Sequence, residues 1–164
     1  MRWVILASRF VAGAAHAQDY DVPMDYRNVA WGPASDLATC LASSASYNSD
    51  MACASTVNAS CVSRGPDGDT TAGLSICGGT SANVLDQEIN VVWRRLKRDL
   101  PAPAFAELLA QQRDWLTYRA REAQAAAGRY GSGSMGAYSG WIVYDEMSAE
   151  RLSRLREIHR GALR

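Results

Sequence analysis

Apolar residues in the second half of the chain recur every three or four positions, which is the spacing of one face of an α-helix. The first such series begins at Val84 and contains Leu85, Ile89, Val92, Trp93 and Leu96. Pro101 and Pro103 then interrupt the pattern, because proline inside a helix lacks the amide hydrogen. A longer helix is predicted from about Ala104 to Gly128. Its inward stripe consists of Phe105, Leu108, Leu109, Gln112, Trp115, Leu116, Arg119 and Ala123.

The first half of the chain predicts shorter helices separated by turn residues. Ser35 or Asp36 is placed to cap a helix that runs to about Ser46, and residues 48–50 are then predicted to form a turn. A second helix carries two of the cysteines, and residues 65–69 form a loop rich in Gly, Pro and Asp.

Two further segments complete the predicted helical part of the chain. Thr70 or Thr71 starts the helix that follows the loop, and a last helix runs to about His159 after a glycine–serine loop. Alternation of apolar and polar residues, the pattern of a strand, is rare. The fold class predicted is therefore all-α, a small bundle of about five helices.

The N-terminal residues have the character of an export signal. A basic residue and an apolar run are followed by Ala15-His16-Ala17, which supplies the small residues that a signal peptidase requires. We interpret residues 1–17 as a signal peptide, residues 18–34 as an extended arm and residues 35–160 as a helical domain. The apolar run is shorter than the roughly 20 residues that span a membrane. A periplasmic or secreted location is expected.

Four cysteines follow this leader, and their spacing favours disulfides over a metal site because it contains no Cys-x-x-Cys pair. Three pairings are possible. Cys40 and Cys53 lie on either side of a predicted turn, and Cys61 and Cys77 lie on either side of the 65–69 loop. We favour these two bonds over the crossed pairing. Each would close a short loop and stabilise the fold by about 3 kcal/mol.

A formal net charge of zero conceals an asymmetry along the chain. Residues 18–90 contain nine acidic residues against two arginines, whereas residues 91–164 contain thirteen basic residues against eight acidic ones. An acidic half attracts a cationic partner over a distance. The simpler interpretation is that these charges are solvated faces of a folded domain. Nucleic-acid binding is disfavoured, because acidic residues are interleaved with the arginines.

The sequence offers little that points to catalysis or to a cofactor. Residues 131–136 match the pattern Gly-x-Gly-x-x-Gly, but a dinucleotide site needs that pattern between a strand and a helix, and here it follows a helix. His159 stands alone near the C-terminal end, and Asp145 and Glu146 are adjacent, so on a helix they point in different directions. Neither a metal site nor a cofactor is predicted, and enzyme activity is not expected.

Four segments in order resemble one family of exported bacterial proteins, the lysozyme inhibitor LprI-like family. They are residues 68–77 ending in a cysteine, residues 85–93 (similar to Asp-x-x-Leu-Asn-x-x-Tyr), residues 112–119 (Gln-Arg-x-Trp-x-x-Tyr-Arg), and the glycine–serine loop with residues 147–151 (similar to Thr-x-x-Arg). Family members usually carry two further cysteines, at positions that correspond to Ala123 and about Val143. Their paired absence leaves no unpaired thiol and implies a less tightly held loop between about residues 128 and 140.

The residues that carry the resemblance are interpreted first as structural. These are Asp86, Asn90, Trp93, Gln112, Trp115, Tyr118, Arg119 and Arg151. A tryptophan on an apolar stripe is a packing residue far more often than a binding residue. An arginine on the same stripe needs a carboxylate, for which Asp86 or Glu88 is the expected partner. Asn90 is expected to satisfy a buried backbone group.

The resemblance implies a non-catalytic protein that binds lysozyme. The lysozyme cleft works with two carboxylates, so a loop that offers a cation and hydroxyl groups would suit it. The partner-binding residues predicted on this basis lie in or beside the glycine–serine loop: Arg129, Tyr130, Ser132, Ser134 and Tyr138. One alternative is that this loop is a solvated connector. The alternative function is a structural or interaction module of the cell envelope without affinity for lysozyme.

Overall fold

Five helices and no strand make up the part of the chain that the computed structural model describes, residues 32–64, 67–131 and 133–164. The helices are α1 Gly32–Ser43, α2 Tyr47–Arg64, α3 Thr71–Asp99, α4 Ala102–Gly128 and α5 Ser134–Ala162. The all-α prediction is therefore confirmed. The predicted signal peptide and most of the predicted N-terminal arm lie outside the described residues.

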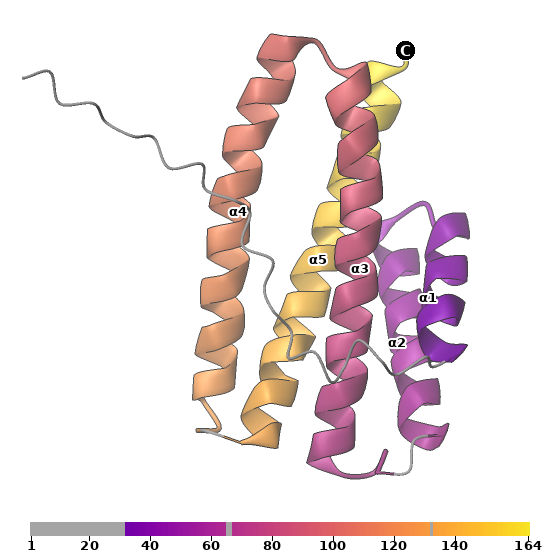
Figure 1. The fold of residues 1–164 in the computed structure, drawn as a ribbon, viewed down its shortest axis with the longest axis vertical. Helices are drawn as coiled ribbons and strands as arrows, with labels where there is room; N and C mark the ends of the chain where they lie inside the picture. Colours follow the sequence, from indigo (N-terminus) through magenta and orange to yellow (C-terminus); the bar gives the residue numbers. More distant parts are fainter. Residues whose placement is uncertain (1–31, 65–66, 132) are drawn as a thin grey trace, which may run out of the picture.

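Helices α3 and α5 form the centre of the bundle and share its largest interface. On one side α4 packs on α5, and on the other side the α1–α2 hairpin packs on α3 and α5 (Figure 1). The connection between α4 and α5 lies at one end of the bundle, and the connection between α3 and α4 lies at the other end with the C-terminus. None of the described helices is both long and apolar enough to span a membrane.

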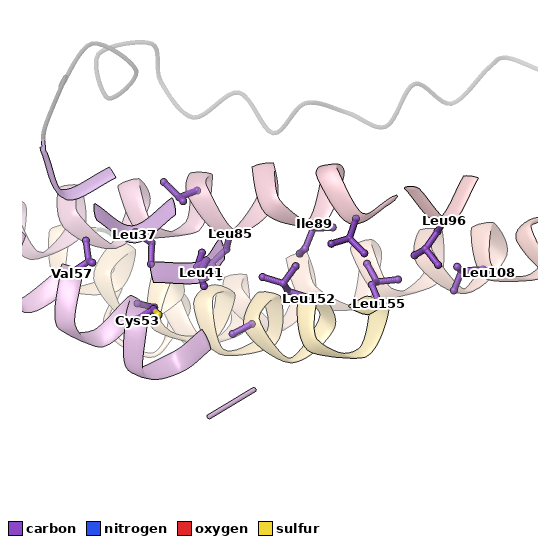
Figure 2. Packing of buried hydrophobic residues seen from close by; sticks show 14 residues of the cluster. Leu37, Leu41, Cys53, Val57, Leu85, Ile89, Leu96, Leu108, Leu152 and Leu155 are labelled. Carbon is purple, nitrogen blue, oxygen red and sulfur yellow. The ribbon is translucent and has the colours of Figure 1, made fainter. Parts of the chain in front are cut away.

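The hydrophobic core runs along the α3–α5 interface and extends under the hairpin. Leu85 and Leu96 of α3 belong to the same buried cluster as Leu152 and Leu155 of α5, and all four are fully buried (Figure 2). The hairpin contributes buried residues of α1 and α2 to the same cluster, namely Leu37, Leu41, Cys53 and Val57. Burial of a leucine side chain contributes about 1.5–3 kcal/mol, so this shared core determines how the hairpin docks.

Both predicted disulfides are present. Cys40 bonds to Cys53 and joins α1 to α2, and Cys61 bonds to Cys77 and joins α2 to α3. One disulfide therefore links the two helices of the α1–α2 hairpin, and the other links the hairpin to α3. No free cysteine remains.

Helix α2 begins earlier than the sequence pattern indicates. The predicted turn at residues 48–50 is wrong, because these residues lie in the first turn of α2. The connecting turn lies before it: the Ser49 hydroxyl accepts hydrogen bonds from the backbone amides of Ala45 and Ser46, and the Ser46 hydroxyl accepts one from the amide of Ser49. This reciprocal arrangement is a capping box, which starts a helix at the residue after Ser46.

Asp50 is in consequence a buried residue of the hairpin interface. Its carboxylate is fully buried and accepts hydrogen bonds from Ser44 and from Nη1 of Arg156 on α5, the latter at 2.7 Å. Nη2 of Arg156 also donates to the carbonyl oxygen of Leu41 at 2.8 Å. One arginine therefore fixes the α1–α2 hairpin to α5.

Two other helix starts differ from the predictions. Helix α1 begins at Gly32, so neither Ser35 nor Asp36 is its cap. Helix α4 begins at Ala102 and includes Pro103 in its first turn. Proline is tolerated there because the first amides of a helix have no partner within the helix. By contrast Thr70 caps α3 as predicted, since its hydroxyl accepts from the amide of Gly73 at 3.1 Å.

Candidate functional site

The residues singled out in the sequence meet in a polar network between α3, α4 and α5. Arg119 of α4 is buried, and its guanidinium donates to both carboxylate oxygens of Asp86 on α3 and to the Ser148 hydroxyl on α5. Tyr144 also donates to Asp86, at 2.6 Å. Burial raises the pKa of Tyr144 well above its ordinary value, so the phenol remains a neutral donor. Of the two partners expected for Arg119, Asp86 is the one used.

Aromatic rings enclose the same guanidinium. The Arg119 Cζ atom lies 3.8 Å from the ring centroid of Tyr144 and 4.5 Å from that of Trp115, so the cation is held between two rings. Arg151 of α5 lies over Trp115 at 5.6 Å and donates from Nε to the buried amide oxygen of Gln112 at 2.7 Å. Trp115, Gln112, Arg119 and Arg151 therefore form one unit that docks α4 on α5.

Three other residues of the signature lie outside this unit. Trp93 is half-buried and packs against Phe105, with 5.1 Å between ring centroids. Tyr118 is 48 % exposed, and Arg121 lies over its ring. Asn90 is exposed, so the expectation that it satisfies a buried backbone group is wrong.

The five residues predicted to bind a partner divide between a short turn and a helix. Arg129 and Tyr130 are exposed in the connection between α4 and α5, and Tyr130 is 61 % exposed. Ser134 and Tyr138 belong to α5 and are half-buried. The Ser134 hydroxyl is hydrogen-bonded to that of Thr71 at the start of α3, which occupies it within the protein. Ser132 lies outside the described residues.

The connection is much shorter than the expected loop of residues 128–140. Only residues 129–133 separate the two helices, because α5 already begins at Ser134. Gly136 and Gly140 are helical residues that allow α5 to approach α4 closely. A Cβ atom added at Gly136 would lie 2.5 Å from the carbonyl oxygen of Gly131, and one added at Gly140 would lie 3.1 Å from that of Ala123. Glycine at position 140 thus lets α5 pack closely against α4 at Ala123, the position at which family members usually carry a cysteine.

Sequence reasoning missed two apolar residues beside this turn. Met135 and Ile142 of α5 are 42 % and 41 % exposed. They are seven residues apart and therefore lie on one face of the helix, two turns from each other. Two signals in the sequence could have identified these residues. Met135 is an apolar residue next to a glycine, and Ile142 follows it at an interval of seven residues. We refer to Arg129, Tyr130 and Met135 together as the α4–α5 tip; Ile142 lies about two helical turns further along α5.

The comparison with protein families identifies the chain. The family model described as "Lysozyme inhibitor LprI" matches residues 61–157, which is more than half of the chain. The chain belongs to the lysozyme inhibitor LprI family. No curated protein and no solved structure matches the chain. The matched region of this LprI family member covers both the polar network and the α4–α5 tip, but not the first disulfide.

The polar network of this LprI family member joins α4 to α3 and α5. Most of its polar groups are bonded to one another, although Nε of Arg119 and Nη2 of Arg151 have no hydrogen-bond partner in the part of the chain that the structure describes. Within the described residues, no three His, Cys, Asp or Glu side chains gather as the ligands of a metal ion would. The α4–α5 tip differs from the network in that Arg129 and Tyr130 are solvent-exposed and form no ion pair within the described residues. The tip is therefore the better candidate for contact with a partner.

Proposed function

We propose that this protein binds lysozyme and inhibits it without catalysing a reaction, and that it does so outside the cytoplasm. Membership of the lysozyme inhibitor LprI family supports the proposal. Two disulfides in a small helical domain support an oxidising compartment such as the periplasm or the exterior of the cell.

The observation that carries the proposal is the composition of the α4–α5 tip. Arg129 and Tyr130 project from a five-residue turn in which Gly131 has a φ of 71°, a left-handed conformation that suits glycine. The cation of Arg129 matches the two carboxylates in the lysozyme cleft, and tyrosine and arginine are the residue types most often dominant in interfaces. Met135 adds an exposed apolar side chain next to this turn, and Ile142 adds another two helical turns further along α5.

The test is the lysis of a bacterial cell-wall suspension by lysozyme, with the purified protein added in increasing amounts. Dose-dependent inhibition is expected, and a chitin oligosaccharide that occupies the cleft should compete with the protein. The Arg129→Ala and Tyr130→Ala variants should each weaken inhibition about thirtyfold, since residues that dominate an interface contribute about 2 kcal/mol. Both side chains are exposed, so the thermal stability of the variants should equal that of the wild type.

The chain supplies a matched control for these two variants. Arg121 and Tyr118 are also an exposed arginine and tyrosine, and they lie on α4 away from the tip. The Arg121→Ala and Tyr118→Ala variants should inhibit as well as the wild type. Equal losses in both pairs would exclude the tip as the binding site. No inhibition by the wild type of any class of lysozyme would instead support an envelope interaction module.

A further inference from the structure

The end of the bundle opposite the α4–α5 tip combines exposed cations with exposed apolar residues. The connection between α3 and α4 lies there together with the C-terminus (Figure 1), and a hydrogen bond of 2.8 Å between Asp99 and His159 joins the last turns of α3 and α5. Helix α5 has 29 residues, so at 1.5 Å per residue this end lies about 40 Å from the tip. We refer to residues 94–104 and 159–163 as the basic end.

Five exposed cations belong to the basic end. Four of them occupy the last two turns of α3 and the fifth lies in the last turn of α5: they are Arg94, Arg95, Lys97, Arg98 and Arg160. Leu96, which stands among the first four in sequence, is fully buried. The cations of α3 therefore lie on the side of the helix that faces away from the core.

Contacts within the protein account for few of these charges. Arg98 pairs at 2.7 Å with Asp99, the one acidic residue of the basic end, and the other four cations form no ion pair within the described residues. The negative end of a helix dipole favours cations in the last turn, which includes Lys97 and Arg98. Arg94 and Arg95 lie one turn earlier, and like charges at positions 94 and 98 destabilise a helix. These two arginines thus serve no purpose in the fold.

Apolar residues exposed at the same end are a second, independent observation. At the α3–α4 connection they are Pro101, Ala102, Pro103 and Ala104, and at the end of α5 they are Ala162 and Leu163. Leu163 is 66 % exposed, the largest exposed fraction among the large hydrophobic residues that the structure describes. Exposed apolar groups beside several Arg and Lys residues are typical of proteins that lie on an anionic membrane, where the cations bind the headgroups and the apolar groups enter the boundary below them.

We propose that the basic end docks on the surface of an anionic phospholipid membrane. The group recognised is the phosphodiester of the lipid headgroup, to which the planar guanidinium of arginine can donate two parallel hydrogen bonds. Leu163 enters the boundary between headgroups and acyl chains. In this orientation the α4–α5 tip faces away from the membrane and stays accessible to a partner in solution. The inference goes beyond lysozyme inhibition and does not depend on it.

The double variant Arg94→Gln/Arg95→Gln removes the two charges that the fold does not require. Each cation near an anionic surface strengthens binding about fivefold, so the double variant should bind such a membrane about thirtyfold more weakly. Glutamine is as good a helix former as arginine and both positions are exposed, so the melting temperature should not fall.

The double variant Arg113→Gln/Arg121→Gln is the matched control. Both of its arginines are exposed residues of α4, and the net charge of the protein changes by the same amount. Arg113 lies eleven residues after the first residue of α4, about 16 Å along the helix, which exceeds the screening length of about 8 Å at physiological salt. This variant should bind the membrane as the wild type does.

The experiment is co-sedimentation of the protein with vesicles made of equal parts of phosphatidylglycerol and phosphatidylcholine, with pure phosphatidylcholine vesicles as the neutral probe. The wild type should bind the mixed vesicles and not the neutral ones, and raising the salt from about 0.1 M to about 1 M should release it, because the screening length falls from about 10 Å to about 3 Å. Leu163→Ser should weaken binding by a factor that does not change with salt, since apolar contact is not screened.

Two results would overturn the proposal. The first is the absence of binding to the mixed vesicles, including the case in which the protein binds soluble polyphosphate alone. The second is an equal loss of binding in the α4 control variant and in the Arg94→Gln/Arg95→Gln variant. Lysozyme takes no part in this experiment, so a failure here is distinguishable from a failure of the proposed function.

Discussion

Arg119 on α4 and Asp86 on α3 form an ion pair across 33 residues of sequence, and the two partners differ in exposure. The Arg119 side chain is 6 % exposed, whereas that of Asp86 is 35 % exposed. Water can therefore solvate the carboxylate if the arginine is lost, but it cannot reach the guanidinium if the aspartate is lost. Loss of the Asp86 carboxylate should therefore cost more stability than loss of the Arg119 guanidinium.

This asymmetry predicts unequal effects of two substitutions. Asp86→Ala leaves a buried charge without a partner and should lower the free energy of unfolding by about 3 kcal/mol. Arg119→Met removes the charge and fills the space between Trp115 and Tyr144, so it should cost only about 1 kcal/mol. Urea denaturation of the two variants measures the difference. A larger loss for Arg119→Met than for Asp86→Ala would contradict the asymmetry.

Because the carboxyl group of Asp145 is buried, we expect the stability of the protein to depend on pH. Burial raises the pKa of this carboxyl to about 8, and its Oδ1 atom has no hydrogen-bond partner within the described residues. In the unfolded chain the pKa is near 3.8. The folded state holds the proton more tightly, so the stability contributed by this group is complete below pH 4 and is lost as the pH rises toward 8.

The Asp145→Asn variant should remove this dependence. It should match the wild type near pH 4 and become more stable than the wild type as the pH rises, by a few kcal/mol near pH 8. Urea denaturation at pH 4, 6 and 8 gives the comparison. A constant difference between the two proteins at all three pH values would show that Asp145 is not the titrating group.

Two glycines at the end of α4 and the start of α5 predict opposite outcomes for the same substitution. A Cβ atom at Gly136 meets carbonyl oxygens at 2.5 and 2.9 Å, whereas nothing lies within 4 Å of one at Gly128. Gly136→Ala should therefore destabilise the protein by about 1–3 kcal/mol, and Gly128→Ala should be neutral or stabilising by up to about 1 kcal/mol. Thermal unfolding distinguishes the two. Equal melting temperatures would mean that the helices are not in close contact at Gly136.

The disulfide between Cys40 and Cys53 and the ion pair between Arg156 and Asp50 both hold the α1–α2 hairpin. Their contributions to the stability of the protein can be measured separately. Replacement of both cysteines by alanine opens a loop of about a dozen residues and should cost about 3 kcal/mol in the chain-entropy model. The hairpin should remain docked, because Arg156 still binds Asp50 and the carbonyl oxygen of Leu41. Adding Arg156→Met should weaken this docking, and a loss of hydrogen-exchange protection in α1 would report the change.

Much of the fold could be predicted from the sequence because its signals are local. Helical spacing of apolar residues depends only on the geometry of one helix, and the end of α3 was visible in the same way from Pro101. The disulfide pairing could also be predicted, since Cys40 and Cys53 flank one turn and Cys61 and Cys77 flank one loop, so each pair is brought together by a short segment of chain.

Other features depended on contacts between distant residues. Asp50 has the sequence context of a turn; the cap formed by Ser46 and Ser49 makes it helical, and Arg156, 106 residues further on, pairs with its buried carboxylate. Gly136 and Gly140 have the composition of a loop, but α4 lies so close that glycine is what the helix requires there. A glycine indicates the absence of a side chain and does not by itself show whether flexibility or close packing is the reason.

The sequence by itself determined the helical class of the fold and the need of Arg119 for a carboxylate, and it favoured the disulfide pairing that forms, because each follows from local geometry or from the cost of burying a charge. The choice of Asp86 over Glu88 was decided only by the tertiary structure. The two residues are two positions apart and point to opposite sides of α3, and the packing of α3 against α5 turns Asp86 toward α4. The same packing left the α4–α5 tip exposed, since exposure is a property of the assembled bundle and not of any one helix.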